Sequence, residues 1–328
     1  MRRIVYIGLL TLACAGSLHA AWKYVYYYGG FGRSDGAFAF PSGVAAVSGS
    51  TSRYVYVADT GNHRIQQIRI YGTTGSTRGS FVNKWGSYGS GNGEFINPTG
   101  VAYSETKDYI YVADQGNHRI QYFDASGSFL GKWGSYGNEA GSFKRPWDVG
   151  VSPRNGFVYV ADSGNDRVQY FTPTGSYLGG WGVPGASSGD FRNPRGIAVT
   201  RGTHVYVSDT GNNRIQLFTY KGVCLGEWGS FGSGDGQFKD ARGVAYSYES
   251  EVFVADAGNS RAQRFTAAGE FQEKFATELD IPTDIDVWPH GLRFVVVDSG
   301  RHRISWWEQE NRVSVLPESL GRVKALFR

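Results

Sequence analysis

A twelve-residue segment occurs six times along this chain, with small variations between the copies. The two most similar copies are VYVADTGNHRIQ at 55–66 and IYVADQGNHRIQ at 110–121. The aspartates of successive copies are 55, 48, 47, 47 and 42 residues apart. Repeats of this length are typical of an array of small structural units rather than of a duplicated enzyme domain.

One full repeat contains four short apolar segments separated by turns: GVAY (100–103), YIYVAD (109–114), RIQYF (119–123) and SFLGKWG (128–134). The turn Asp-x-Gly-Asn separates the second segment from the third, and we expect its glycine to adopt a positive backbone angle. The chain has 47 glycines and 15% aromatic residues, which suits many short strands joined by tight turns. Four antiparallel strands in each of six units predict an all-β, six-bladed β-propeller over residues 21–316.

Each unit should bury two apolar faces by stacking against its neighbours around a ring. The first strands, which carry little charge, would line the crowded centre. One tryptophan recurs at the end of the fourth segment in four of the units, and we expect it to pack between blades rather than to stack on a ligand. These residues are Trp85, Trp133, Trp181 and Trp228.

The tandem pattern P-x-G-[VI]-A…VYVAD-x-G-N-x-R-[IV]-Q resembles the NHL repeat, and the resemblance extends from about Trp22 to Leu316. It implies a six-bladed propeller used mainly to bind protein, peptide, carbohydrate or RNA partners. The last unit departs from the pattern, because Arg301 replaces the asparagine and Asp284 stands where most units have glycine. These departures put the local geometry of the sixth blade in doubt.

Residues 1–20 have the order of a secretory signal peptide: Arg2 and Arg3, an apolar run, and small residues ending at Ala20. We therefore expect an exported protein, secreted or periplasmic, with lipoprotein anchoring through Cys14 as the alternative. Loss of residues 1–20 lowers the formal net charge from +4 to +2, which favours no nucleic-acid partner. Cys224 would then be the remaining cysteine, so no intramolecular disulfide is possible.

The two ends of the repeat region compete for one position. The segment from Trp22 resembles the end of a repeat and could supply an outer strand to the last blade. The segment RVSVL at 312–316 could occupy the same position, and the sequence leaves this choice open. Residues 317–328 are expected to form a short C-terminal tail.

Every unit carries an arginine five residues after its aspartate. A catalytic site needs a single constellation, whereas these pairs recur in every blade, so we interpret them as structural and expect no catalytic residues among them. The pairs are Asp59 with Arg64, Asp114 with Arg119, Asp162 with Arg167, Asp209 with Arg214, Asp256 with Arg261, and Asp298 with Arg303.

Three histidines, His63, His118 and His302, occupy one equivalent turn position in three of the units. These units would be neighbours in a closed ring, which makes a shared metal conceivable, but turn histidines are more often only solvated. No nucleophile elbow, phosphate loop or zinc-type cysteine pair is present. We expect no metal and no cofactor, although a metal ion at the mouth of the channel remains an alternative.

Function should lie where equivalent positions of the repeat differ. The residue that opens the first strand varies between units and should ring the mouth of the central channel, on the same face as the Gly-rich loops and the Asp-x-Gly-Asn turns. Two neighbouring guanidiniums beside an indole suit an anionic or sugar-like group. The candidate ligand-binding residues are Thr99, Trp147, Asp148, Arg195, Arg242 and Thr283, and Ser42 holds the equivalent position in the first unit.

These features favour a monomeric binding scaffold that recognises a protein, peptide or carbohydrate on its loop-rich face. The alternative is an enzyme similar to the peptide-amidating lyases or lactonases, which place a metal at the channel of a propeller. At the mouth, however, the sequence offers Asp148 and Asp284, on opposite blades, and no ring of histidines. RNA binding would be the third possibility, and the expected export and low charge argue against it.

Overall fold

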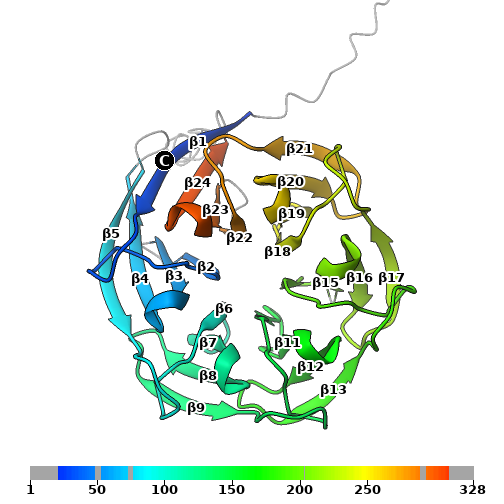
Figure 1. Cartoon of the computed structure of the whole chain (residues 1–328), viewed down its shortest axis with the longest axis horizontal. Coiled ribbons are helices and arrows are strands. Elements are labelled where there is room, and N and C mark those ends of the chain that lie inside the picture. Colours follow the sequence, from blue (N-terminus) through cyan, green and yellow to red (C-terminus); the bar gives the residue numbers. More distant parts are fainter. Residues whose placement is uncertain (1–20, 49–52, 73–76, 203, 289–292, 310–328) are drawn as a thin grey trace, which may run out of the picture.

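The computed structural model describes residues 21–48, 53–72, 77–202, 204–288 and 293–309. Within these ranges, six four-stranded antiparallel sheets stand around a central axis (Figure 1). The predicted all-β, six-bladed propeller is therefore confirmed. None of the described helices is long and apolar enough to cross a membrane.

Each sheet is one blade, with its first strand innermost. Blade one contains β2 (Val44–Ser48), β3 (Arg53–Asp59), β4 (Arg64–Tyr71) and β5 (Arg78–Trp85). Blade two contains β6 (Pro98–Ser104), β7 (Tyr109–Asp114), β8 (Arg119–Asp124) and β9 (Phe129–Trp133). Blade three contains β10 (Asp148–Val151), β11 (Val158–Asp162), β12 (Arg167–Phe171) and β13 (Tyr177–Trp181).

Blade four contains β14 (Ile197–Val199), β15 (His204–Asp209), β16 (Arg214–Thr219) and β17 (Cys224–Trp228). Blade five contains β18 (Ala241–Tyr246), β19 (Glu251–Asp256), β20 (Arg261–Thr266) and β21 (Phe271–Phe275). Blade six contains β22 (Pro282–Val287), β23 (Arg293–Asp298), β24 (Arg303–Gln309) and, as its outer strand, β1 (Trp22–Gly29).

The ring is closed by β1, which pairs antiparallel with β24 from Trp22 opposite Gln309 to Gly29 opposite Arg303. Trp22 inserts its ring beside Phe294 of the same blade, at 5.0 Å between ring centroids, and beside Phe253 of blade five at 5.6 Å. The N-terminal segment therefore holds the outer position that the sequence left open. The competing segment 312–316 lies outside the described residues.

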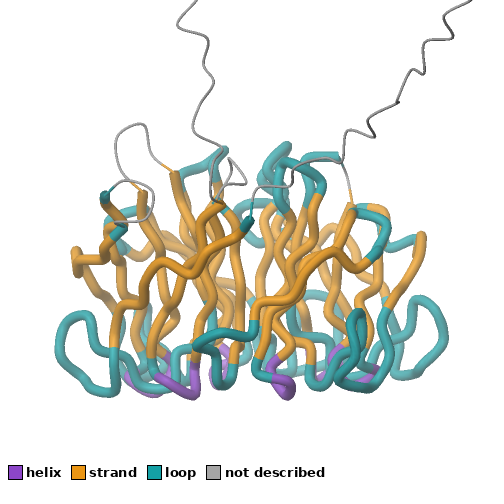
Figure 2. The backbone as a smooth tube through the Cα atoms, turned by 90° about the horizontal axis from the view of Figure 1, so that it is seen from above, coloured by secondary structure: helices purple, strands orange, loops and turns teal. Residues whose placement is uncertain are grey.

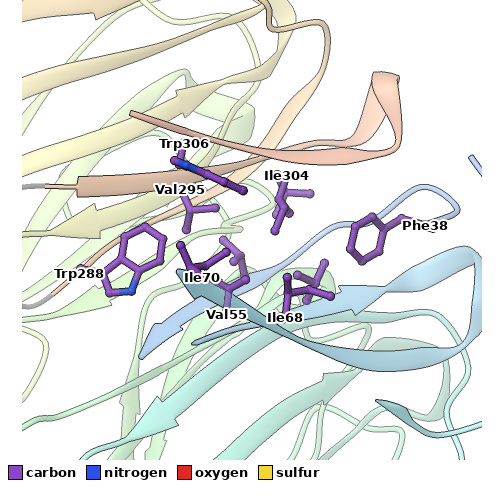
Figure 3. Packing of buried hydrophobic residues seen from close by; sticks show 11 residues of the cluster. Phe38, Val55, Ile68, Ile70, Trp288, Val295, Ile304 and Trp306 are labelled. Atoms are coloured by element: carbon purple, nitrogen blue, oxygen red, sulfur yellow. The ribbon is translucent and has the colours of Figure 1, made fainter. Parts of the chain in front are cut away.

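The hydrophobic core lies between the blades. One cluster joins blades six and one and includes Phe38, Val55, Ile68, Val295 and Trp306 (Figure 3). Valines and isoleucines dominate the facing strands because β-branched side chains pack well on a pleated surface. Burial of such side chains contributes on the order of 1.5–3 kcal/mol each.

The recurrent tryptophans pack between blades, as predicted. Trp85 ends the outer strand β5, and its ring lies 5.9 Å from that of Tyr56 in its own blade and 5.8 Å from that of Phe123 in the next. The glycine of the next β8–β9 turn, Gly127, has a φ of +89°, and a Cβ there would lie 2.6 Å from the indole. A side chain at this position would therefore separate the two blades.

The Asp-x-Gly-Asn turns differ from the prediction. Each forms a short 3-10 helix, η1 (Thr60–Asn62), η2 (Gln115–Asn117), η3 (Ser163–Asn165), η4 (Thr210–Asn212), η5 (Ala257–Asn259) or η6 (Ser299–Arg301). The positive φ falls on the residue after the asparagine, for example 54° at His63, and not on the glycine. The glycine is required for a different reason: a Cβ on Gly61 would lie 2.8 Å from the carbonyl oxygen of Ala39.

All six 3-10 helices lie at one end of the ring, together with the long loops that connect successive blades (Figure 2). We call this end the loop-rich face. The first strand of a blade begins at this end, because the start of β6 (Pro98) pairs with the end of β7 (Asp114).

Candidate functional site

The six repeated Asp–Arg pairs fasten the Gly-rich loops to the blades. In blade three, Asp162 accepts hydrogen bonds from Arg167 Nε at 2.8 Å, from Asn165 Nδ2 at 2.8 Å and from the backbone N–H of Lys144 at 2.8 Å. Arg167 then donates to three carbonyl oxygens of the preceding loop, those of residues 138, 139 and 142. Each pair thus connects a blade to the loop that enters it.

These aspartates are fully buried, and burial raises the pKa of Asp114, Asp162 and Asp209 against the lowering effect of their hydrogen-bond donors. The sixth pair is looser, with Arg303 Nε 3.3 Å from Asp298. There Glu278 shares the guanidinium with Asp298. The departure of the last unit from the repeat therefore changes its ion pairing while the blade remains.

The mouth of the central channel is tightly closed on the loop-rich face. Its ring of residues encloses only about 10 Å³. The Thr99 hydroxyl donates to the carbonyl oxygen of Trp147 at 2.6 Å, and the Thr283 hydroxyl donates to that of Pro41 at 3.3 Å. Both threonines are buried, so these two candidate residues connect neighbouring blades and do not present free hydroxyls.

Beside the mouth, three of the candidate residues form one cluster, which we call the mouth cluster: Trp147, Arg195 and Arg242, with Asp240. The Arg195 guanidinium lies 4.3 Å from the centroid of the Trp147 ring. Asp240 accepts from Arg195 at 3.2 Å and from Arg242 at 2.7 Å. Asp148 lines the mouth as predicted, but the carboxylate that lies between the two arginines is Asp240.

Asp148 also lines the channel below the mouth. Its carboxylate accepts from the backbone N–H of Ile197 in the next blade at 3.0 Å. On the opposite side, Asp284 accepts from the N–H of Val44 at 2.8 Å, and Asp286 accepts from that of Ala46 at 2.7 Å. The three carboxylates and the first strands of all six blades surround a cavity of about 150 Å³.

These channel carboxylates, Asp148, Asp284 and Asp286, have strongly perturbed ionisation. Burial raises the pKa of Asp148 to about 7 and that of Asp286 to about 7. Burial, with Asp148 across the channel, also raises the pKa of Asp284. Each group accepts backbone N–H bonds, and within the described part of the chain no cation lies beside it.

Asp286 was missed by the sequence analysis. A signal was available, because the equivalent residue is alanine or glycine in every other blade: Ala45, Ala102, Gly150, Ala198 and Ala245. An acidic residue at a position otherwise reserved for small residues indicates a special environment at the centre of the ring.

The positions of Asp148 and Asp284 reflect the spacing of the blades. The equivalent residue is glycine in the other four blades, and a Cβ on Gly100 would lie 2.5 Å from the Cα of Asp148. A Cβ on Gly196 would lie 2.2 Å from the carbonyl oxygen of Arg242. Neighbouring first strands approach too closely at these glycines for any side chain.

At the other end of the ring, a polar bridge crosses the axis. Glu105 follows β6 in blade two, and Arg201 and Tyr248 follow the first strands of blades four and five. Arg201 donates to Tyr248 Oη at 2.8 Å and lies 3.3 Å from Glu105, and Tyr248 donates to Glu105 at 3.0 Å. Because blades two and five face each other, this bridge spans the far end of the channel.

The three turn histidines do not meet at a common point. Each Nδ1 accepts a backbone N–H from the loop entering the next blade: His63 from Asn97 at 3.1 Å, His118 from Arg145 at 3.0 Å and His302 from Phe40 at 3.0 Å. Among the described residues, no group of three or more His, Cys, Asp or Glu side chains is placed to hold a metal ion. The channel carboxylates in particular are turned to backbone amides on opposite sides, which does not fit a shared metal.

The sequence analysis also missed a set of exposed aromatic side chains on the loop-rich face. Tyr88 and Tyr136 are 69% and 68% exposed, and Phe31 and Phe231 are 72% and 69% exposed. The signal was the recurrence of an aromatic residue before a glycine, two or three residues after the end of the outer strand, as in WGSYG, WGSFG and GGFG.

Comparisons with known proteins agree with this architecture. The NHL repeat matches residues 143–171 and 191–218, and a family described as a 6-bladed beta-propeller matches residues 54–136. No curated protein matches the chain.

Several solved structures share the fold at low sequence identity. A catalytically inactive virginiamycin B lyase from Staphylococcus aureus with quinupristin is 13% identical, covering 88% of this chain and 99% of its own, with a TM-score of 0.57. A gluconolactonase from Xanthomonas campestris is 14% identical, covering 83% and 86%, with a TM-score of 0.60. A nidogen/laminin complex is 15% identical, covering 71% and 82%, with a TM-score of 0.52. At such identities the likeness shows the fold alone, so the comparisons identify the chain as a six-bladed β-propeller with NHL-repeat matches at residues 143–171 and 191–218.

Proposed function

We propose that this protein is an exported NHL-repeat scaffold that binds a peptide, protein or glycan ligand on its loop-rich face. The observation that supports it is the mouth cluster, in which Trp147 and Asp240 hold two arginines beside the centre of that face. A stacked, hydrogen-bonded guanidinium loses little side-chain entropy on binding, because its orientation is already fixed.

The charge balance of the mouth cluster favours an acidic group in the ligand. Burial lowers the pKa of Arg195, and the nearby Arg242 and Arg145 lower it further, while Asp240 opposes them with a single negative charge. The side chains of Arg195 and Arg242 remain 17% and 21% exposed. A carboxylate or sulfate could therefore accept hydrogen bonds from the guanidiniums at the surface.

The other features of this proposal come from the sequence. Residues 1–20 would direct export, and the low net charge would disfavour nucleic acid. The protein would act as a monomer and without a cofactor.

The experiment is a thermal-shift comparison of the native protein with the double variant Arg195→Ser, Arg242→Ser. The probes are sodium sulfate, oligogalacturonate and a peptide with a free C-terminal carboxylate, each at low and at physiological salt. We expect the ligand-induced shift to fall by at least half in the double variant, and all shifts to shrink at the higher salt. Arg154→Ser, at an exposed residue in the turn after β10, is the control. Equal responses from all three proteins would exclude the mouth cluster as the ligand site.

A second candidate function is an enzyme of the lyase or lactonase kind. It is supported by the fold that the chain shares with a lyase and a gluconolactonase and by the channel carboxylates, since groups with a pKa near 7 can both take up and release a proton. The test is hydrolysis of gluconolactone and cleavage of quinupristin by the native protein. Activity that disappears in both Asp148→Asn and Asp286→Asn would establish this function, and no turnover above buffer would exclude it for these substrates.

A further inference from the structure

The exposed aromatic residues of the loop-rich face are fixed by the backbone. Tyr88 lies between two hydrogen bonds, from Phe95 N to the Ser87 carbonyl oxygen at 2.8 Å and from Gly89 N to the Phe95 carbonyl oxygen at 3.2 Å. The same pair of bonds flanks Phe31, Tyr136 and Phe231. These side chains are exposed because the fold directs them outward.

Three of these four rings contact a turn histidine, and a further exposed ring, Phe40, lies 4.6 Å from His302. The ring centroids are 5.0 Å apart for Tyr88 and His63, 5.0 Å apart for Tyr136 and His118, and 4.8 Å apart for Phe31 and His302. The three pairs belong to consecutive blades, six, one and two. We call these six residues the aromatic–imidazole arc.

The histidines of the arc present a fixed hydrogen-bond donor. Because each Nδ1 accepts a backbone N–H, a neutral imidazole must carry its proton on Nε2. Burial lowers the pKa of His63 and of His118, which favours the neutral form at physiological pH. Each pair thus combines an exposed aromatic ring with an N–H donor whose direction is set by the next blade.

The fold itself does not need an imidazole at this position. Asp166 accepts the equivalent backbone N–H, from Asn193, at 2.6 Å in blade three. Asn213 accepts it, from Asp240, at 3.2 Å in blade four. In the loops that follow blades three and four, the position equivalent to Tyr88 holds Pro184 and Phe231. Among these equivalent positions, an exposed ring therefore lies beside a turn histidine only along the arc.

A surface cavity lies at the centre of the arc. It has a volume of about 490 Å³ and is lined by Tyr88, His63, Asn62, Arg33 and Lys84, with other residues of the same loop and turn. This volume is in the range that accommodates a small organic ligand. An aromatic ring beside an imidazole donor and two cationic side chains suits a ligand that has an apolar face and a rim of hydroxyl groups.

We propose that the aromatic–imidazole arc binds a neutral oligosaccharide of β-linked, gluco-configured pyranoses. The equatorial hydroxyls of such sugars leave C–H faces that stack on Phe31, Tyr88 and Tyr136, while the hydroxyl oxygens accept hydrogen bonds from the histidine Nε2–H groups. One ring per blade suits a repeating polymer. A membrane surface, or the apolar core of a protein–protein interface, would instead require a contiguous apolar patch on this face. The three rings of the arc are separated by polar residues.

This inference rests on the proposed binding role of the loop-rich face but uses residues distinct from the mouth cluster. The experiment is isothermal titration calorimetry of the full chain with cellohexaose and chitohexaose, and with maltohexaose as an α-linked comparison. We expect saturable binding of at least one β-linked hexaose and weaker binding of maltohexaose. The single changes Tyr88→Ser and Tyr136→Ser should each weaken binding about tenfold, and the triple change Phe31→Ser, Tyr88→Ser, Tyr136→Ser should abolish it.

The chain provides matched controls. Phe231→Ser removes an equally exposed ring that lies outside the arc, and it should leave affinity within twofold of native. His63→Asn with His118→Asn introduces the residue that blade four uses, so it should preserve the thermal midpoint while lowering affinity about tenfold. The double variant Arg195→Ser, Arg242→Ser should retain neutral hexaose binding, which separates failure at the mouth cluster from failure at the arc.

Three results would overturn the proposal. The first is no heat of binding from any β-linked hexaose up to millimolar concentration. The second is an equal loss of affinity in Phe231→Ser and Tyr88→Ser. The third is co-sedimentation with phosphatidylcholine–phosphatidylglycerol vesicles that the triple aromatic variant loses, in a protein that binds no hexaose, because that would assign the arc to a membrane surface.

Discussion

Two sets of buried carboxylates in this propeller have opposite environments. The aspartates of the repeat each have an arginine beside them and connect a blade to its loop, as Asp162 does with Arg167. The channel carboxylates, Asp148, Asp284 and Asp286, have backbone amides as partners and no cation among the residues that the structure describes. Burial raises the pKa of Asp162 in the first set, and it raises the pKa of Asp148 and of Asp286 in the second set to about 7. The repeat therefore pairs each of its buried aspartates with an arginine, whereas the channel buries carboxylates whose partners are backbone amides.

The largest effect should come from breaking a compensated pair. Asp162→Ala would leave Arg167 without its buried carboxylate and Asn165 and the Lys144 N–H without their acceptor. We expect a loss of about 3–5 kcal/mol in the free energy of unfolding, measured by denaturant titration. Asp162→Asn, which keeps the shape and one acceptor oxygen, should lose less. A change below about 1 kcal/mol in Asp162→Ala would contradict the anchoring role of the pair.

The next effect concerns the glycines that stand where the channel has Asp148 and Asp284. Gly196→Ala would place a Cβ 2.2 Å from the carbonyl oxygen of Arg242, and the first strands of two blades would have to separate. We expect a loss of about 1–3 kcal/mol in the free energy of unfolding. Gly226→Ala in β17 is the matched control, because its Cβ would meet no atom within 4 Å. Similar losses in both variants would show that strand spacing does not decide which blades carry an acid.

An effect of similar size but opposite sign, present only above about pH 4, is expected for Asp148→Asn. The pKa of this carboxyl is raised to about 7 in the folded chain, so the folded state holds a proton that the unfolded state releases above about pH 4. Native stability should therefore fall as pH rises from about 4 to 7 and then level off. The variant should match the native protein at pH 4 and exceed it by about 1–3 kcal/mol at pH 8.

Thermal and denaturant unfolding across pH 4–8 measures this difference. Asp286→Asn should show the same sign, because the pKa of Asp286 is also raised to about 7 by burial. The contradicting result is a native free energy of unfolding that rises from pH 4 to 8, with neither variant more stable than the native protein at pH 8. It would mean that the channel carboxylates are not held protonated.

The smallest effect should come from the bridge at the far end of the channel. The Arg201 side chain is 60% exposed, so its ion pair with Glu105 is screened by water and salt. Arg201→Ser should change the free energy of unfolding by less than about 1 kcal/mol at physiological salt. A larger loss would show that this bridge, unlike other exposed ion pairs, helps to hold the ring closed.

Much of the fold could be predicted because each repeat encodes its own local structure. The Asp-x-Gly-Asn turns, the spacing of the apolar segments and the recurrent tryptophans gave the number of blades and their boundaries. The conformation of the turn was predicted less well, because its positive φ falls on His63 and its equivalents and not on the glycine. Gly61 is needed instead for a close approach to the neighbouring loop. That contact joins residues distant in sequence, and a local pattern does not encode it.

The sequence by itself determined the six-fold architecture and the identity of the residues that break it, including Arg195, Arg242 and Trp147. Only the tertiary structure decided how those residues combine. It placed Asp240 between the two arginines, put Asp148 in the channel with Asp286, and gave the outer position of blade six to β1. The physical reason is ring closure: the contacts at the axis and across the final blade join residues from separate repeats, and their spacing is set only when all the blades pack together.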